Sequence, residues 1–261
     1  MTAESLATDF TLDAFHRGDF WLKQPARRGH RAGMDAMMLA AALPSGFAGR
    51  IADLGAGAGA AGLAAVSRCR EARTVLFERS AEMAGFARQT LALAQNAWLT
   101  DRAAVIQADV TLRGPARAKA GLADNGFEAV LMNPPFNAGH DRQTPDGLKA
   151  EAHVMADGLL EAWIRTAAAI TRTRGLIALI VRPDAIGPAL DALEGRFGGL
   201  EIKPIHPRDD TAAIRIVIRG VRASRKRLVF APPLFLHESG SDLFSAGADA
   251  INNGRASLFG D

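Results

Sequence analysis

The stretch best suited to chemistry is a set of polar and rigid residues that ends an apolar run in mid-chain. Residues 127–132 form that run, and they are followed by Asn133, Pro134, Pro135 and Phe136. Proline has no backbone N–H and fixes its own φ, so the pair ends a strand and stiffens the exit. The Asn133 amide and the Pro134 carbonyl offer two hydrogen-bond acceptors, and the Phe136 ring offers an aromatic wall. Such a slot fits a planar molecule with an –NH2 group, although an ordinary strand exit can carry the same residues.

A glycine-rich sequence, Asp-Leu-Gly-Ala-Gly-Ala-Gly, occupies residues 53–59. It follows a short apolar strand and precedes an expected helix at residues 60–68. Glycine permits a tight turn and a close approach by a ligand, while a helix N-terminus offers free N–H groups. Its spacing is not that of the dinucleotide fingerprint. It resembles motif I of S-adenosylmethionine-dependent methyltransferases.

That resemblance implies roles for the residues of the turn. Asp53 anchors the loop or the amino group of the cofactor, and Gly55, Ala56 and Gly57 pass the backbone beneath its methionine moiety. The alternative is a glycine turn with a purely structural role.

Two acids end the next two expected strands. Glu78 follows residues 73–77, and Asp109 follows residues 103–108. An acid at the end of the second strand of a doubly wound sheet can accept both hydroxyls of a ribose. In the methyltransferases that the chain resembles, an acid at the place of Asp109 contacts the adenine amino group. The ordinary alternatives are a capping or surface acid at Glu78 and a turn residue at Asp109.

The order of apolar segments predicts an α/β fold with a doubly wound, seven-stranded, mostly parallel sheet whose last strand is antiparallel. Ligands bind at the carboxyl ends of the strands in such sheets. The glycine loop, both acids and Asn133 all fall at those ends. We expect a lead-in and helix packed on the core at residues 1–45, the methyltransferase domain at 46–221, and an extension at 222–261.

Several element boundaries follow from composition and turn signals. A hairpin is expected through residues 17–19 and a loop at residues 112–126. The remaining strands are expected at residues 127–132, 176–181, 200–206 and 212–219, and the remaining helices at 34–43, 80–97, 151–173 and 186–197.

Motif I together with Asn133–Phe136 resembles the methyltransferases that modify planar nitrogens. The flanks narrow the resemblance. Residues 24–36 and 232–238 are similar to the family of tRNA1(Val) adenine-37 N6-methyltransferases. This implies S-adenosylmethionine as cofactor, N6 of an adenine in tRNA as target, and Asn133 in both the catalytic and the cofactor-binding sets. Many relatives carry Tyr where this chain has Phe136.

Basic residues gather in two places. Arg27, Arg28 and Arg31 lie near the N-terminus, and a second cluster spans residues 215–227. They can hold phosphates if the fold brings them to one face, and solvated loops are the alternative. His140, in a polar loop after Phe136, is the other expected substrate contact.

Other functions share these signals. A protein glutamine N5-methyltransferase fits the same slot, as does a DNA or rRNA base methyltransferase. A degenerate fold that binds RNA without catalysis, or a small-molecule methyltransferase, would keep the architecture. The short stretch before motif I and the absence of an obvious target-recognition domain count against the protein and DNA substrates.

Composition limits the partners. Net charge is +3, and the single Cys69 provides neither a disulfide framework nor a thiolate metal cluster. His140 has no second ligand at metal spacing, so no metal is expected. With no basic-then-apolar leader and no apolar run long enough for a bilayer, we expect a cytoplasmic protein without a membrane span.

Overall fold

The computed structural model describes residues 9–26, 32–135 and 158–261. Five residues with predicted roles lie outside these ranges, and their contacts are not described: Arg27, Arg28, Arg31, Phe136 and His140. No helix in the described part is long and apolar enough to cross a membrane.

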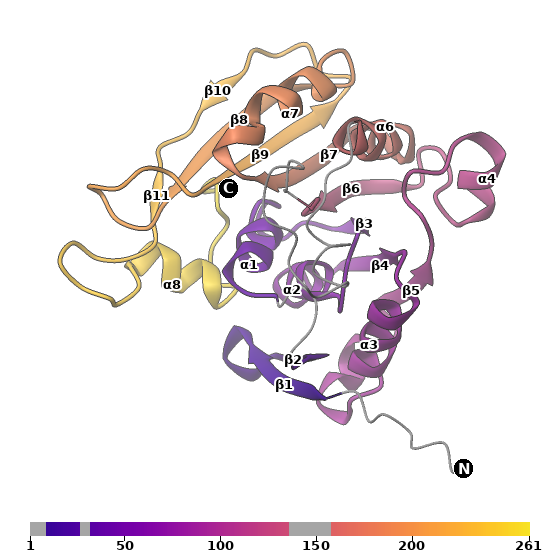
Figure 1. Ribbon diagram of the computed structural model, residues 1–261, viewed down its shortest axis with the longest axis horizontal. Helices are drawn as coiled ribbons and strands as arrows, with labels where there is room; N and C mark the ends of the chain where they lie inside the picture. Colours follow the sequence, from indigo (N-terminus) through magenta and orange to yellow (C-terminus); the bar gives the residue numbers. More distant parts are fainter. Residues whose placement is uncertain (1–8, 27–31, 136–157) are drawn as a thin grey trace, which may run out of the picture.

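A twisted sheet forms the centre of the molecule (Figure 1). Its strand order is β10-β8-β9-β7-β6-β3-β4-β5, and the short β11 also pairs with β8. β9 is antiparallel to β7 and β8, and the other pairs are parallel. The seven long strands match the predicted doubly wound sheet. Their bounds are β3 Gly49–Leu54, β4 Ala72–Glu78, β5 Ala103–Gln107, β6 Phe127–Met132, β7 Thr171–Val181, β8 Phe197–His206 and β9 Arg215–Arg222, with β10 at Val229–Phe230 and β11 at Leu234–Phe235.

Helices cover both faces of this sheet (Figure 1). Strand residues alternate between two apolar layers, as Ile51 packs into one cluster and Ala52 into the other. The first layer contains α1 (Met34–Ala41), α2 (Ala60–Arg68), α3 (Ala81–Leu91) and α8 (Ala246–Asn252). The second contains α6 (Leu159–Ile170) and α7 (Ile186–Leu193), while the short α4 (Gly114–Lys119) follows β5.

The N-terminal hairpin is present as predicted. β1 (Phe10–Phe15) pairs with β2 (Phe20–Pro25) through a 3-10 turn at His16–Gly18. Phe20 and Leu22 are fully buried. Asn96 holds the hairpin to the fold, because its side chain accepts from Trp21 N at 2.9 Å and donates to Trp21 O at 2.7 Å.

Some boundaries differ from the predictions. The helix expected at residues 80–97 ends at Leu91, and a 3-10 segment, Ala94–Leu99, carries the buried Asn96 into its contacts with the hairpin. The loop expected at 112–126 contains α4, which has a proline in its first turn. β7 begins at Thr171 rather than Leu176, and β8 begins at Phe197, where a helix was expected.

The C-terminal segment packs against α1 and the sheet. Arg219 is 6% exposed. Its guanidinium lies 2.8 Å from Asp261 Oδ2 and 2.6 Å from Glu201 Oε2. It also donates to Ala42 O at 3.2 Å and lies 4.3 Å from the centre of the Phe259 ring. One buried cation therefore holds the chain end, strand β8 and the end of α1 together.

Replacement of Arg219 by alanine should destabilise the protein by about 2 kcal/mol, because the half-buried Glu201 and the exposed Asp261 lose their shared buried cation. Urea unfolding measures this loss. Arg225→Ala is the matched control, since Arg225 is exposed, and it should stay within about 0.5 kcal/mol of the unaltered protein. Equal stability of the two variants would contradict the role assigned to Arg219.

Candidate active site

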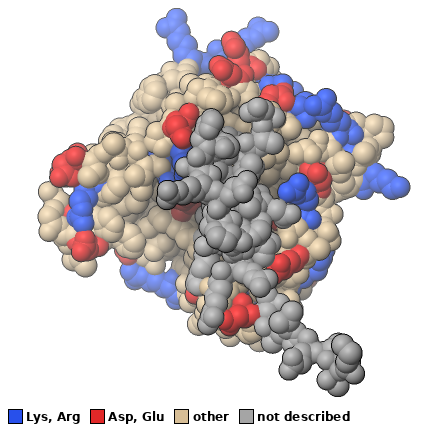
Figure 2. All heavy atoms as spheres, viewed as in Figure 1, with Lys and Arg blue, Asp and Glu red and all other residues tan. Residues whose placement is uncertain are grey.

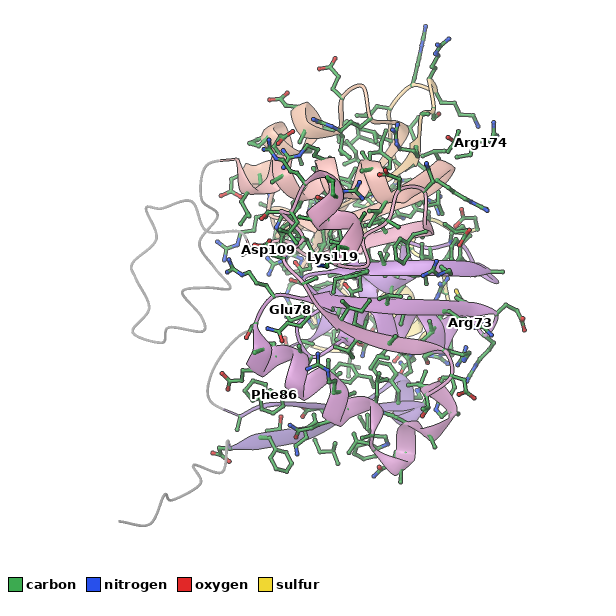
Figure 3. The ribbon with its side chains drawn as sticks, turned by 90° about the vertical axis from the view of Figure 1, so that its right-hand side faces the viewer. Arg73, Glu78, Phe86, Asp109, Lys119 and Arg174 are labelled. Carbon is green, nitrogen blue, oxygen red and sulfur yellow. The ribbon has the colours of Figure 1, made fainter. Side chains whose placement is uncertain are left out.

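The predicted motifs meet at the carboxyl edge of the sheet, where the strand order reverses. β3 pairs with β6 in the register Leu54↔Met132. The next residues along these strands are Gly55 and Asn133, which therefore begin their loops on neighbouring strands about 4.8 Å apart. Glu78 and Asp109 lie at this same edge of the sheet, whereas Arg73 and Arg174 lie at the other edge (Figure 3).

The glycine loop turns sharply after β3. Gly55, Gly57 and Gly59 have φ values of 72°, 56° and 100°, in the left-handed region that favours glycine. The N–H groups of Gly55 and Ala56 both donate to Phe77 O, at 2.8 and 3.0 Å. A methyl group at Gly55 would lie 2.3 Å from Trp163 Cη2, whereas one at Gly57 would meet only Met83 Cε at 3.6 Å.

Asp53 connects the end of β3 to the first turn of α2. Its side chain is 2% exposed, and Oδ2 accepts from Gly62 N, in the first turn of α2, at 2.8 Å. Burial raises the pKa of Asp53 to about 7; the Gly62 N–H opposes this shift, and the charge of Glu78 adds to it. This contact is with helix α2, and the two roles expected for Asp53, at the loop and at the cofactor amino group, stay predictions.

Glu78 connects the glycine loop to the start of α3. Oε2 accepts from Gly57 N at 2.8 Å, and Oε1 accepts from Ser80 N at 2.7 Å. Ser80 in turn caps α3, because Oγ accepts from Met83 N at 3.3 Å. Glu78 is half-buried at the edge that the loop borders.

Asp109 forms a turn of its own. Oδ1 accepts from Thr111 N at 2.8 Å and from Thr111 Oγ1 at 2.7 Å. This is the turn geometry that aspartate favours after a strand. The half-buried side chain stands at the same edge as Glu78 (Figure 3).

Asn133, Pro134 and Pro135 end β6 as predicted. Pro134 is buried, and its two neighbours are half-buried. Among the described residues, no hydrogen bond engages the Asn133 amide. Phe136, which follows, lies outside the described residues.

Two contacts at this edge were not predicted from the sequence. Trp163, 8% exposed, reaches the glycine loop from α6. Arg215, at the start of β9, donates to Asp35 at the start of α1 over 2.8 Å. The sequence showed Arg215 as a member of the late basic cluster and gave no sign of its pairing with Asp35. The amphipathic pattern of α6 gave no sign that Trp163 touches the loop.

The site is suited to a ligand with positive charge. Glu78 bonds the glycine loop at Gly57, and Asp109 stands at the same edge of the sheet (Figure 3). A methyl group at Gly57 would meet only Met83 Cε, at ordinary contact distance. S-adenosylmethionine carries a sulfonium and an ammonium group, so these residues fit it. Open α/β sheets bind ligands at such a reversal of strand order.

The family model of the methyltransferase small domain matches residues 31–202, more than half of the chain. The chain belongs to this family. It is an S-adenosylmethionine-dependent methyltransferase with a class I fold. The comparison with functionally curated proteins found no match.

A solved structure of a predicted O-methyltransferase from Agrobacterium tumefaciens is 46% identical, with a TM-score of 0.75, and the match covers 85% of this chain and 97% of that one. The fold is also shared with M. jannaschii TYW2 in complex with AdoMet, at 8% identity and a TM-score of 0.56, over 85% of this chain and 88% of that one. The tRNA (m1A58) methyltransferase TrmI from Aquifex aeolicus matches at 14% identity and a TM-score of 0.52, over 76% of this chain and 72% of that one.

The raised pKa of Asp53 predicts a pH-dependent stability. The folded chain holds a proton on this carboxyl from about pH 4 to pH 7, whereas the unfolded chain releases it, so the free energy of unfolding falls as pH rises through that window. Asp53→Asn keeps an acceptor for Gly62 and removes this slope. Urea unfolding should show the variant gaining on the order of 2 kcal/mol relative to the unaltered protein between pH 5 and pH 8. A difference that is constant with pH would contradict the assignment.

The two glycines of the loop should respond differently to alanine. Gly55→Ala combines a left-handed φ with a clash against Trp163, and should cost roughly 2–4 kcal/mol. Gly57→Ala has the backbone strain alone and should cost about 1 kcal/mol. Thermal unfolding measures both. Gly55→Ala combined with Trp163→Phe should be less harmful than the sum of the single changes, and strict additivity would refute the contact.

Proposed function

We propose that this methyltransferase transfers a methyl group to the exocyclic N6 of an adenine in RNA, with tRNA as the substrate. The observation that carries the proposal is the β3–β6 register, which sets Asn133 and its rigid proline pair beside Gly55 of the cofactor loop. In this proposal the amide acceptor lies where the methyl donor and the amine meet. A cytoplasmic enzyme follows from a tRNA substrate.

The chemistry needed is orientation of a poor nucleophile. The lone pair of an exocyclic amine is delocalised into the ring. In this proposal Asn133 Oδ1 and the Pro134 carbonyl accept the two amine hydrogens, turn the lone pair toward the methyl group and stabilise positive charge as it develops. Pro134 and Pro135 keep the acceptors fixed, and close placement of the reactants lowers the barrier further. The bound cofactor supplies an electrophilic methyl group.

The cofactor roles follow from the positions of the acids. Gly55, Ala56 and Gly57 pass beneath the methionine part, and the buried Asp53 holds the loop that carries them. Glu78 takes the ribose hydroxyls, since a carboxylate has about four acceptor sites and two are used by Gly57 and Ser80. Asp109 takes the adenine amino group.

The substrate roles belong to residues outside the described ranges. Phe136 stacks on a base splayed out of its loop, and His140 touches the substrate. Arg27, Arg28 and Arg31 contact phosphates. Their sequence patterns alone support these assignments.

Incubation of the purified protein with labelled S-adenosylmethionine tests the proposal directly. Total bacterial tRNA, unmodified DNA and a protein release factor serve as parallel substrates, followed by nucleoside and amino-acid analysis. N6-methyladenosine in tRNA is expected. Methylglutamine in protein, or a methylated ribose hydroxyl in the RNA, would overturn it in favour of a protein N-methyltransferase or of O-methylation respectively.

Asn133→Ala should lower the transfer rate by about a hundredfold or more and change S-adenosylmethionine affinity far less, because it removes an acceptor used chiefly in the transition state. Isothermal titration and single-turnover transfer measure the two quantities. Asn133→Gln is the control that keeps the amide but displaces it. Its transfer rate should lie between that of the unaltered protein and that of Asn133→Ala. A variant that loses cofactor affinity instead would contradict the role of Asn133.

A further inference from the structure

The side chains of the late basic cluster divide into those that bond other parts of the fold and those that do not. Arg215 pairs with Asp35, and Arg219 is buried among Glu201, Asp261 and Phe259. Arg222 donates to two backbone carbonyls, Ala168 O at 2.8 Å and Arg196 O at 3.0 Å. The remaining members are Arg225, Lys226 and Arg227. Among the described residues none of these three has an ion-pair partner.

These three cations belong to residues 225–230, a segment we call the edge ridge. All six of its side chains are exposed. Its backbone is nevertheless fixed to strand β8: Gly199 N donates to Lys226 O at 2.9 Å, and Val229 and Phe230 pair with Glu201 and Ile202. The side chains are therefore presented to solvent by an ordered support.

The segment that carries the ridge packs closely on β8 at two glycines. A methyl group at Gly198 would lie 2.2 Å from Ser224 O, and one at Gly199 would lie 3.3 Å from Lys226 Cβ. Only glycines allow the segment to lie directly on the strand at this bulge.

The ridge changes character along its length. Three cations come first, and Leu228, Val229 and Phe230 follow at 40%, 53% and 65% exposure. Glu201, the residue paired with Val229, already has Arg219 as its counter-ion. Lys and Arg side chains also project from the upper end of the molecule in Figure 2, the end at which Figure 1 places β8 and β10. Positive charge therefore stands beside an exposed aromatic ring.

The ridge lies far from the proposed active site. β10 is separated from β6 by β7, β9 and β8, so four strand spacings of about 4.8 Å place it roughly 19 Å away across the sheet. A free nucleoside or an amino-acid side chain held at Asn133 cannot touch it. A polynucleotide can reach both places.

We propose that the edge ridge is a docking surface for the sugar-phosphate chain of an RNA substrate, at a distance from the nucleotide held at Asn133. Arg225, Lys226 and Arg227 neutralise phosphates, and Phe230 stacks on an unpaired base. The inference rests on the proposed RNA function and adds to it the surface that binds the body of the substrate.

Charge and shape favour a polynucleotide over the other occupants of a basic, apolar edge. Membrane surfaces are bound by amphipathic helices with a broad apolar face, whereas the ridge offers three apolar side chains on an extended segment. A second copy of the chain would bring its own three cations to the same edge, and like charges in close contact are unfavourable.

The test measures binding of total bacterial tRNA to the whole protein by fluorescence anisotropy at several salt concentrations. Arg225→Gln with Arg227→Gln should lower the slope of log affinity against log salt by about 1.4, the release expected for two single-strand phosphate contacts. Phe230→Ser should weaken binding about tenfold at constant slope. The matched control, Arg73→Gln with Arg88→Gln, removes two exposed cations elsewhere and should leave both quantities unchanged.

Transfer kinetics separate docking from catalysis. For full-length tRNA, the double variant at Arg225 and Arg227 should raise KM and leave kcat unchanged. For a short oligonucleotide that carries only the modified loop, neither constant should change. If the unaltered protein binds tRNA but methylates none of it, the proposed function fails while the docking inference stands.

Three results would overturn the inference. One is unchanged tRNA affinity and salt slope in both ridge variants. Another is unchanged tRNA binding together with loss of binding to vesicles of anionic phospholipid, which would assign the ridge to a membrane surface. A third is a dimer in sedimentation that Phe230→Ser dissociates without effect on tRNA affinity, which would assign it to a second copy.

Discussion

The site depends on one register of backbone hydrogen bonds, that between β3 and β6. These strands are distant in sequence, and the chain builds β4 and β5 on one side before it returns to add β6 on the other. The pairing Leu54↔Met132 brings the glycine loop and Asn133 together at the reversal point. A slip by one residue would turn every side chain of β6 to the opposite apolar layer, so burial on both faces fixes the register and, through it, the site.

Two carboxyl groups beside this pair of strands form hydrogen bonds at the glycine loop and at the helix that follows it, and their negative charge favours a cationic ligand. Asp53 is fully enclosed and holds α2 by a single backbone contact, while Glu78 holds the loop from its other side. Burial and the neighbouring charge make ionisation of Asp53 costly. A cation bound beside the loop would lower that cost, so cofactor binding and Asp53 ionisation should favour each other.

Local signals predicted the parts of the fold that local chemistry decides. The bounds of α2 and β6 were foreseen to the residue, because glycines precede the helix and prolines follow the strand. The end of α3 was missed since Asn96 leaves the helix to bond Trp21, more than seventy residues earlier. The contact of Trp163 with Gly55 was invisible for the same reason, because no pattern in either segment refers to the other. The roles of Asn133, Glu78 and Asp109 remain predictions, although their positions agree with them.

The late basic cluster shows how topology alters a sequence pattern. Read along the chain, residues 215–227 form one patch of charge. β9 is antiparallel to its neighbours, so Arg215 lies at the carboxyl edge of the sheet and Arg222 at the opposite edge, about 23 Å away at 3.3 Å per residue. β9 itself uses three of the six cations: Arg215 pairs with Asp35, Arg219 is buried, and Arg222 bonds two backbone carbonyls. The other three, Arg225, Lys226 and Arg227, follow β9 and lie exposed at the outer edge. An RNA that contacts both the site and the edge ridge would therefore have to extend across the sheet, and its recognition would depend on shape over that distance more than on the single base that is modified.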